Sequence, residues 1–428
     1  MKILLVNNFY YNRGGDCTYM FALKKLLEEK GHKVFVFSMS HPDNFESKDS
    51  QYFVNYINYD EEVKNINISS GLKVLNRTVF SLEARKKIEQ FIIEKKPDIA
   101  HLQNIHHHIT PSIFFTFEKY NIPIIWTLHD YTIICPNTSF LSHGKVCEKC
   151  RKKRYFWPSF EKCKKDSFSA STMAGIEATV HNLSRVHNRV DTFIAPSEFL
   201  KDKCIAYGIN KEKIKCLHYF FEGKMFNDNN QESDYYLYVG RISWEKGVKT
   251  LIDAAVKVSL NGDNAGSMKG NKLKIVGDGP LYKEMISYTR SKDKNNVIEF
   301  LGHKSHEDVL KLIKGCRFSV IPSEWYENYP FAIIEAFICG KPAIGTKLGG
   351  IPELIKNTER GLLFEAGNSN ELSSAIKLLL DNPNLCEEMG EKARAFVEKE
   401  LSAEAHYHEL INIYTQAISR HRVTIAST

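Results

Sequence analysis

The chain has 428 residues, a length that predicts two domains rather than a single core. Its hydrophobic fraction of 43% and charged fraction of 25% are those of a soluble globular protein. No run approaches the roughly 20 apolar residues that span a bilayer, and the first residues, MKILLVNN, indicate a strand rather than a secretory signal. We therefore expect a cytoplasmic protein.

The positive charge lies in the first half of the chain. The formal net charge is +7, and residues 1–220 hold 32 Lys and Arg against 23 acidic residues, a net of +9. This balance favours an anionic contact for the first half: a membrane surface, a phosphate-bearing acceptor or nucleic acid. The alternative is a solvated, lysine-rich surface without a specific partner, and this is the preferred interpretation when net charge is the only evidence.

Short apolar runs alternate with amphipathic segments in the first half, a pattern typical of β-α-β units and parallel sheets. The runs predict strands at 2–7, 34–38, 98–102, 122–128 and 192–196. Helices are predicted at about 18–30, 83–95 and 198–207. We therefore expect a first doubly wound α/β domain over residues 1–221.

A polar, Asn-rich segment at 222–234 is predicted to be a linker, and the same alternation then restarts over residues 235–402. Strands are predicted at 235–240, 273–276, 297–301, 318–321 and 343–345. The segment 261–271 is predicted to be a surface loop. The last residues, 403–428, have a helical pattern.

Two carboxylates stand eight residues apart after the predicted strand 318–321. Glu327 lies in a loop with Pro330, and Glu335 lies in the helix-like run FAIIEAFICG. Ligands of open parallel sheets bind at the carboxyl ends of strands, beside the N-terminus of the next helix. That N-terminus suits a phosphate, and Glu335 is placed to accept hydrogen bonds from sugar hydroxyls. Two solvated glutamates beside a helix start are the alternative.

The segment GRISWEKG, residues 240–247, follows the first strand of the second half. Arg241 and Lys246 lie five residues apart, around a loop that opens a helix at Gly247. A diphosphate needs two cations and nearby backbone N–H groups, and arginine can hold two of its oxygens at once. An ordinary Arg and an ordinary Lys on a loop are the alternative.

Gly14 and Gly15 follow the first predicted strand, where glycines let the backbone approach a ligand closely. His129 ends a strand in the run WTLHDY. A structural role, with its hydrogen bonds satisfied within the protein, is the commoner one for a single histidine at a strand end.

Four cysteines follow His129 in the pattern C-x11-C-x2-C-x12-C: Cys135, Cys147, Cys150 and Cys163. In a cytosolic protein this spacing favours a structural zinc site over disulfides, with an iron–sulfur cluster or four unlinked thiols as alternatives. The insertion at about 135–163 lacks a core of its own and would benefit from a metal.

The overlapping segment KCRKKRYFWPSFEKCKK, residues 149–165, has eight Lys and Arg and one acid, with four aromatic residues between them. Such a patch suits an anionic membrane surface or single-stranded nucleic acid, with a solvated loop as the alternative.

These motifs resemble those of the family 4 retaining glycosyltransferases, which have the GT-B fold. Glu327 and Glu335 resemble the family's E-x7-E motif, and residues 240–247 resemble its G-R-x4-K-G element. The resemblance spans nearly the whole chain and is strongest over 235–364. It implies two doubly wound Rossmann-like domains facing across a cleft, an acceptor-side domain over 1–221 and a nucleotide-sugar donor-binding domain over 235–402. It also implies that the last helix, in 403–428, crosses back to the first domain.

The same resemblance implies the roles of the site residues. Arg241 and Lys246 would bind the donor diphosphate, Glu335 the ribose and Glu327 the donor sugar. Gly14 and Gly15 would approach the diphosphate from the first domain, and His129 would lie near the donor sugar and the acceptor.

The expected reaction transfers a sugar from a nucleoside diphosphate sugar, with retention and without a catalytic metal or other cofactor, to a surface polysaccharide or a lipid-linked glycan. We expect a UDP-sugar in preference to a GDP- or ADP-sugar. An anionic membrane at the inner face of the cell membrane is the expected further partner, and no nucleic acid is expected. The alternatives are a GT-B epimerase or phosphorylase, or a non-catalytic basic adaptor for membrane or nucleic acid.

Overall fold

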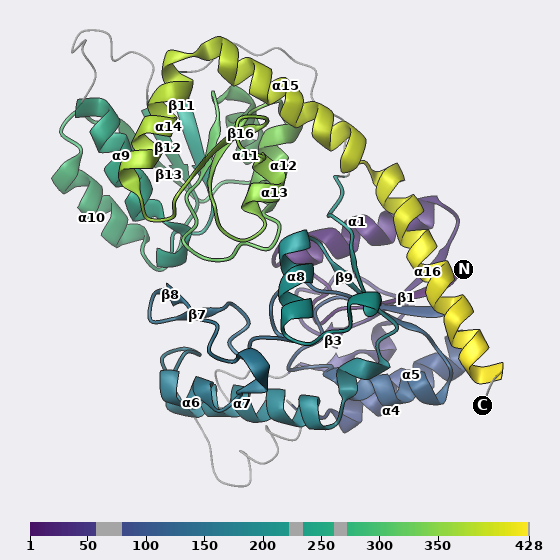
Figure 1. Ribbon diagram of the computed structural model, residues 1–428. Coiled ribbons are helices and arrows are strands. Elements are labelled where there is room, and N and C mark those ends of the chain that lie inside the picture. Colours follow the sequence, from purple (N-terminus) through teal and green to yellow (C-terminus); the bar gives the residue numbers. More distant parts are fainter. Residues whose placement is uncertain (57–78, 222–233, 261–271, 427–428) are drawn as a thin grey trace. The chain divides into compact units, whose positions relative to one another are not determined.

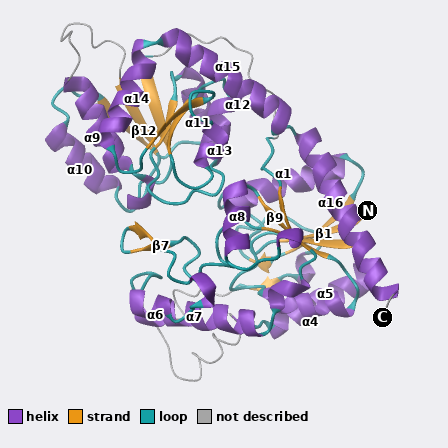
Figure 2. Cartoon of the chain, in the orientation of Figure 1, coloured by secondary structure: helices purple, strands orange, loops and turns teal. Residues whose placement is uncertain are grey.

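The structure is a computed structural model that describes residues 1–56, 79–221, 234–260 and 272–426. The chain divides into two compact units. Met1–His143, Cys147–Phe220 and Ala403–Thr428 form the first, and Gly144–Val146 and Phe221–Ser402 form the second. Each unit has strands in its interior and helices around them (Figure 2). Within the described residues, no helix has both the length and the apolar character needed to cross a membrane.

The first unit is built on a six-stranded parallel sheet in the order β10-β9-β6-β5-β1-β2. Its strands are β1 (Lys2–Val6), β2 (Lys33–Phe37), β5 (Ile99–Leu102), β6 (Ile124–Thr127), β9 (Thr192–Ala195) and β10 (Ile214–Cys216). The residues of β5, β6 and β9 are all buried, which explains their nearly continuous apolar sequence. The sheet changes direction of winding between β1 and β5.

Helices surround this sheet in the first unit (Figure 1). They are α1 (Gly15–Glu29), α4 (Leu82–Lys95), α5 (Phe114–Lys119), α6 (Trp157–Glu161), α7 (Phe168–Leu183) and α8 (Glu198–Ala206). Serine side chains cap three of them, because Ser81, Ser167 and Ser197 each accept a hydrogen bond from the backbone N–H three residues later. Elsewhere in the chain, short strands form two small sheets, β3 (Met39–Ser40) with β4 (Val54–Asn55), and β7 (Leu141–Ser142) with β8 (Lys145–Val146).

The C-terminal helix, α16 (Ala403–Ala426), belongs to the first unit, although it follows the second in the sequence. Buried polar contacts hold it there. The hydroxyl of Tyr414 lies 2.6 Å from Nδ1 of His101, and Nε2 of His406 lies 3.0 Å from the hydroxyl of Tyr19. The prediction that the last helix returns to the first domain is confirmed.

The second unit has a six-stranded parallel sheet in the order β13-β12-β11-β14-β15-β16, the doubly wound order of dinucleotide-binding folds. Its strands are β11 (Tyr235–Val239), β12 (Lys272–Val276), β13 (Ile298–Gly302), β14 (Ser319–Ile321), β15 (Ala343–Thr346) and β16 (Gly361–Phe364). Its helices are α9 (Val248–Leu260), α10 (Tyr282–Lys292), α11 (His306–Gly315), α12 (Phe331–Ile338), α13 (Ile351–Ile355), α14 (Ser369–Asp381) and α15 (Pro383–Glu400). Buried residues of helices α9 and α14, among them Leu251 and Ile376, form one hydrophobic core with Tyr236 of β11 and Phe318, the residue before β14.

The strands and helices named from the sequence agree in type with the structure and differ by one to three residues at their ends. Several elements were not predicted, among them the strands β10 and β16 and the helices α5, α7, α11 and α14. The predicted loop 261–271 lies outside the described residues, as does the predicted linker 222–234 apart from Asp234.

Candidate functional site

The strand order of the second unit reverses between β11 and β14, which lie next to each other in the sheet. Ligands of such sheets bind where two loops diverge from the carboxyl ends of the strands on either side of this reversal. The loop after β11 contains Arg241 and Lys246, and the loop after β14 contains Glu327. Topology alone therefore places the two predicted cations and the first predicted carboxylate at one edge of one sheet.

The loop after β11 is held against the loop after β14 by a close backbone approach at Gly247. Its φ of +67° is in the left-handed region, and an added Cβ would lie 1.9 Å from the carbonyl oxygen of Pro322. The backbone N–H of Glu324 donates to the carbonyl oxygen of Glu245 at 2.8 Å. Glycine at position 247 therefore fixes the place of Lys246, the residue before it.

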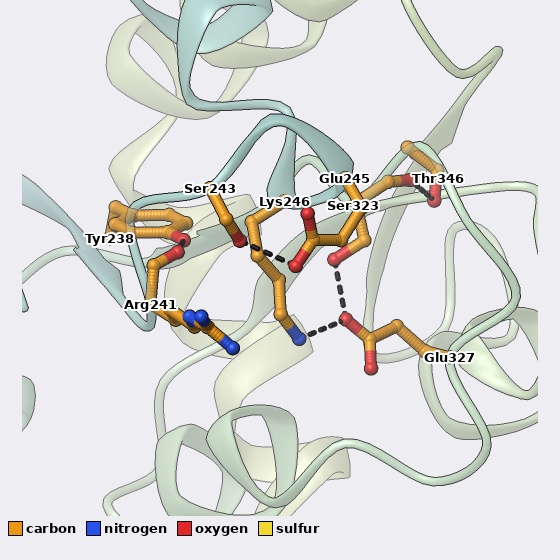
Figure 3. Close-up of polar contacts among 8 residues, drawn as sticks. All are labelled: Tyr238, Arg241, Ser243, Glu245, Lys246, Ser323, Glu327 and Thr346. Atoms are coloured by element: carbon orange, nitrogen blue, oxygen red, sulfur yellow. Dashed lines mark hydrogen bonds and ion pairs between the residues drawn. The ribbon is translucent and has the colours of Figure 1, made fainter. Parts of the chain in front are cut away.

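Lys246 and Glu327 form an ion pair between the two loops (Figure 3). Nζ of Lys246 lies 2.6 Å from Oε1 of Glu327, and the hydroxyl of Ser323 donates to the same oxygen at 2.7 Å. The side chain of Lys246 is 25% exposed and that of Glu327 is 10% exposed. The structure thus brings together two of the predicted donor-site residues in one partly buried cluster.

The pKa of Glu327 is lowered from its ordinary value, although its burial alone would raise it. The positive charge of Lys246 and the hydrogen bonds from Lys246 and Ser323 outweigh the effect of burial. Glu327 is therefore ionised at neutral pH and can accept hydrogen bonds from hydroxyl groups. Ser323 was not identified from the sequence. It stands four residues before Glu327, at the end of a buried strand.

A pair of glycines further along the chain positions the backbone of Glu327. The N–H of Gly350 donates to the carbonyl oxygen of Glu327 at 2.7 Å. A Cβ at Gly349 would lie 2.2 Å from that oxygen, and the φ of Gly349 is +62°. The segment KLGGIPELI therefore carries its two glycines because the chain there passes against the Glu327 loop.

Arg241 belongs to the same loop as Lys246 but is exposed. The hydroxyl of Tyr238 donates to its carbonyl oxygen at 2.8 Å and fixes the backbone at this position. Figure 3 shows its guanidinium group on the same side of the loop as the ammonium group of Lys246. Both cations can contact an anionic ligand, although the same loop also carries a second carboxylate, Glu245, which accepts a hydrogen bond from the hydroxyl of Ser243 at 2.5 Å.

Glu335 lies on α12. Its Oε1 approaches Nδ1 of His306 at 3.7 Å, and burial raises its pKa to about 7. The side chain is 23% exposed. A carboxyl group of this kind can donate or accept a hydrogen bond near neutral pH, which suits a hydroxyl partner.

Gly14 and Gly15 lie in the first unit, at the start of α1. Gly14 is the N-cap residue, with extended backbone, and both glycines are exposed. Asp16 follows in the first turn of the helix, where its carboxylate accepts a hydrogen bond from Nδ2 of Asn104 at 3.4 Å. At the start of α1, two residues without side chains therefore leave the backbone accessible. This backbone lies near the point where the strand order of the first sheet reverses.

His129 follows β6 in the first unit, and both of its ring nitrogens have partners. Nδ1 lies 2.7 Å from the hydroxyl of Tyr219, and Nε2 lies 2.7 Å from Oε1 of Gln103. The ring also stacks on Tyr219. Burial lowers the pKa of His129 to about 4, so the imidazole is neutral at pH 7. These contacts fix the orientation of the ring, and neither Gln103 nor Tyr219 was identified from the sequence.

The four cysteines of the predicted zinc site are all free thiols. Burial raises the pKa of Cys135 to about 12 and that of Cys163 to about 11. Across the described ranges, the structure has no group of three or more His, Cys, Asp or Glu side chains placed to hold a metal ion. The pKa of Cys150 is raised by burial and also by the charges of Cys135, Cys163 and Cys147, so the four thiols lie near one another, and the zinc site stays a prediction.

Two doubly wound units with a C-terminal helix that returns to the first unit define the GT-B fold. Solved GT-B glycosyltransferases resemble the chain over nearly its whole length. The protein HepE of Anabaena, solved in complex with UDP, matches with a TM-score of 0.67 and 16% identity and covers 97% of this chain and 100% of its own. A sucrose-phosphate synthase of Thermosynechococcus elongatus matches with a TM-score of 0.67 and 17% identity, covering 98% of this chain and 99% of its own.

Family models match both halves of the chain. The model described as Glycosyltransferase Family 4 matches residues 13–220, and the model described as Glycosyl transferases group 1 matches residues 222–396. An uncharacterized glycosyltransferase of Methanocaldococcus jannaschii is 28% identical over 93% of this chain and 94% of its own. The N-acetyl-alpha-D-glucosaminyl L-malate synthase of Bacillus anthracis is 22% identical over 97% of both chains. The chain belongs to the family 4, group 1 glycosyltransferases.

Proposed function

We propose that this glycosyltransferase transfers a hexosyl or related sugar from a UDP-sugar to a surface glycan or a lipid-linked glycan, with retention of the anomeric configuration. The observation that carries the proposal is the cluster of Lys246, Glu327 and Ser323, with Arg241 beside it, at the reversal of the second sheet. Structures of the similar protein HepE hold UDP or UDP-glucose, which supports UDP as the nucleotide of the donor in preference to GDP or ADP.

In the proposed reaction, the bond between the anomeric carbon and the diphosphate oxygen breaks while the acceptor oxygen bonds to the same face of that carbon. The acceptor proton passes to the leaving diphosphate. Arg241 and Lys246 would stabilise the negative charge that develops on this group, the largest electrostatic demand of the step. Because these two cations supply positive charge at the diphosphate, we propose that transfer needs no metal ion.

Lys246 and Ser323 both contact Oε1 of Glu327. The second oxygen, Oε2, would then meet a hydroxyl group of the donor sugar. Glu335 would hold the ribose through its carboxyl group, which in its ionised form accepts hydrogen bonds from the ribose hydroxyls. In the first unit, Gly14 and Gly15 would let the diphosphate approach the start of α1, and the fixed, neutral ring of His129 would orient the donor sugar and the acceptor.

Product analysis tests this proposal. The protein would be incubated with UDP-sugars, with and without saccharide and glycolipid acceptors, and with a chelator in a parallel series. We expect release of UDP that depends on an acceptor, survives the chelator, and yields by NMR a linkage of the donor's anomeric configuration. An isomerised UDP-sugar formed without acceptor would instead identify an epimerase, and an inverted linkage would refute retention.

The Arg241→Ala variant provides the control for the site, because Arg241 is exposed. It should fold normally and lose turnover at low donor concentration. Unchanged turnover would place the diphosphate elsewhere and would favour a non-catalytic role for this edge of the sheet.

A further inference from the structure

The first unit carries an exposed apolar surface on α6 and α7, which follow one another along one edge of this unit (Figure 1). The two helices are in contact, and the hydroxyl of Thr172 donates to that of Ser159 at 2.9 Å. The exposed large apolar side chains on and beside these helices are Phe156, Phe160, Phe168, Ile176, Val180 and Leu183. We call these six side chains the α6–α7 face.

The exposed side of α7 has no charge. At 3.6 residues per turn, its four apolar members of the α6–α7 face fall within about 120° of the helix circumference. The helix contains one acid, Glu177, and one basic group, His181, and both side chains are buried on the opposite side. Leu183 is 74% exposed and Phe160 is 73% exposed, high values for apolar side chains. A helix side of this kind needs a partner that excludes water from it.

Positive charge surrounds this face. Residues 149–185 hold nine Lys and Arg against three acids, a net of +6 out of the chain's +7. Of the three acids, Glu161 is paired with Lys149 at 2.5 Å and Glu177 is buried, so that Asp166 is the one exposed acid of the segment. Arg151, Lys152, Lys153 and Arg154 precede α6, and Arg185 follows α7; all are exposed.

We propose that the α6–α7 face docks on an anionic lipid surface, with its apolar side chains at the level of the headgroups and its cations on the lipid phosphates. Charge complementarity selects this partner. A second copy of this chain would bring the same excess of cations against it. A single-stranded nucleic acid would use the aromatic rings but would gain nothing from Ile176, Val180 and Leu183, which cannot stack on bases. The proposal goes beyond the proposed function and does not rest on the identity of the donor.

Vesicle flotation tests the proposal with the full-length protein. The probes are vesicles of phosphatidylcholine alone and of equimolar phosphatidylcholine and phosphatidylglycerol. We expect binding to the anionic vesicles that falls steeply with salt, and little binding to the neutral ones. The Ile176→Glu/Leu183→Glu variant should reduce the partition coefficient by about tenfold or more, because two apolar anchors become charged.

Leu260→Glu is the matched control, since Leu260 of α9 is 66% exposed and lies in the second unit. It should bind vesicles as the wild type does. A second readout is fluorescence quenching of Trp157 by lipids brominated on their acyl chains, with Trp157→Phe to isolate its signal. A melting shift with UDP that persists in Ile176→Glu/Leu183→Glu would show that this variant folds and keeps its donor site.

Three results would overturn the proposal. The first is equal vesicle binding by the wild type and Ile176→Glu/Leu183→Glu. The second is binding to an oligonucleotide that is tighter than binding to anionic vesicles. The third is a dimer in solution that the same variant abolishes while no vesicle binding occurs.

Discussion

Replacing Lys246 with alanine should weaken the fold of the second unit as well as donor binding, because Lys246 is the charge partner of the largely buried Glu327. At 2.6 Å and an effective dielectric constant of about 20, two unit charges attract by about 6 kcal/mol. Desolvation cancels part of this energy, and removing one partner of a buried pair costs about 3 to 5 kcal/mol. Since Lys246 keeps a quarter of its side chain exposed, we expect a loss near the lower value, about 3 kcal/mol.

The assay is thermal unfolding, followed by calorimetry so that the transition of the second unit can be separated. In a domain of this size a loss of about 3 kcal/mol lowers the melting temperature by roughly 6 to 12 °C. Lys283→Ala is the matched control, because Lys283 is an exposed lysine on α10 of the same unit. Its melting temperature should change by less than about 2 °C.

The pH dependence gives the sharper test. In the wild type the pKa of Glu327 is lowered, so its stabilising effect is present above pH 4.5, its ordinary value, and is lost as the pH falls through the lowered value. In Lys246→Ala the same carboxyl is buried without its partner, so its pKa rises and protonation stabilises the variant as the pH falls. The difference in melting temperature between the wild type and Lys246→Ala should therefore become smaller from pH 7.5 to pH 5. A difference that stays constant with pH, or that equals the effect of Lys283→Ala, would refute this reasoning.

Three further outcomes follow from the site. Arg241→Ala should raise the dissociation constant of UDP in calorimetric titration by about 10- to 100-fold, because charge-assisted hydrogen bonds to the diphosphate are lost. The melting temperature of the free protein should stay unchanged. An unchanged affinity for UDP would contradict the role of Arg241 in binding the diphosphate. In chemical denaturation, Gly247→Ala should lower the free energy of unfolding by at least about 2 kcal/mol more than Gly340→Ala. Both glycines have a φ of +67°, but only a side chain at position 247 would meet a backbone oxygen. Equal losses of free energy would show that φ alone determines the effect. The affinity for UDP-glucose should rise by up to about tenfold from pH 6 to pH 8, because the carboxyl of Glu335, with its pKa of about 7, ionises over this range. Glu335→Gln should remove this pH dependence. The same pH dependence in that variant would assign it to another group.

Five of the six described strands of the second unit could be predicted from the sequence, because each is a short, largely apolar run. Arg241, Lys246 and Glu327 were identified because they follow the carboxyl ends of β11 and β14, which topology alone brings together. β16 was missed, since GLLF is too short to be told from a buried helix segment. The helix α7 was missed because its small, uncharged residues give a weak amphipathic pattern.

The contacts that decide how the site behaves could not be predicted, because they join residues far apart in the sequence. Lys246 pairs with Glu327 across 81 positions, and His129 meets Tyr219 across 90. The sequence predicted a lysine that binds the donor diphosphate and a histidine near the reaction. The structure shows that the first neutralises a buried carboxylate and that the second is held neutral with both nitrogens occupied.

The measurement that tests the central claim most directly is a thermal-shift screen against UDP, GDP, ADP, TDP and CMP and their common sugar conjugates. A ligand that binds only the folded state raises the melting temperature by mass action. We expect a clear shift with UDP and at least one UDP-sugar, and its loss in Arg241→Ala. The absence of a shift with every nucleotide, or a shift that Arg241→Ala leaves intact, would contradict a donor site at the reversal of the second sheet.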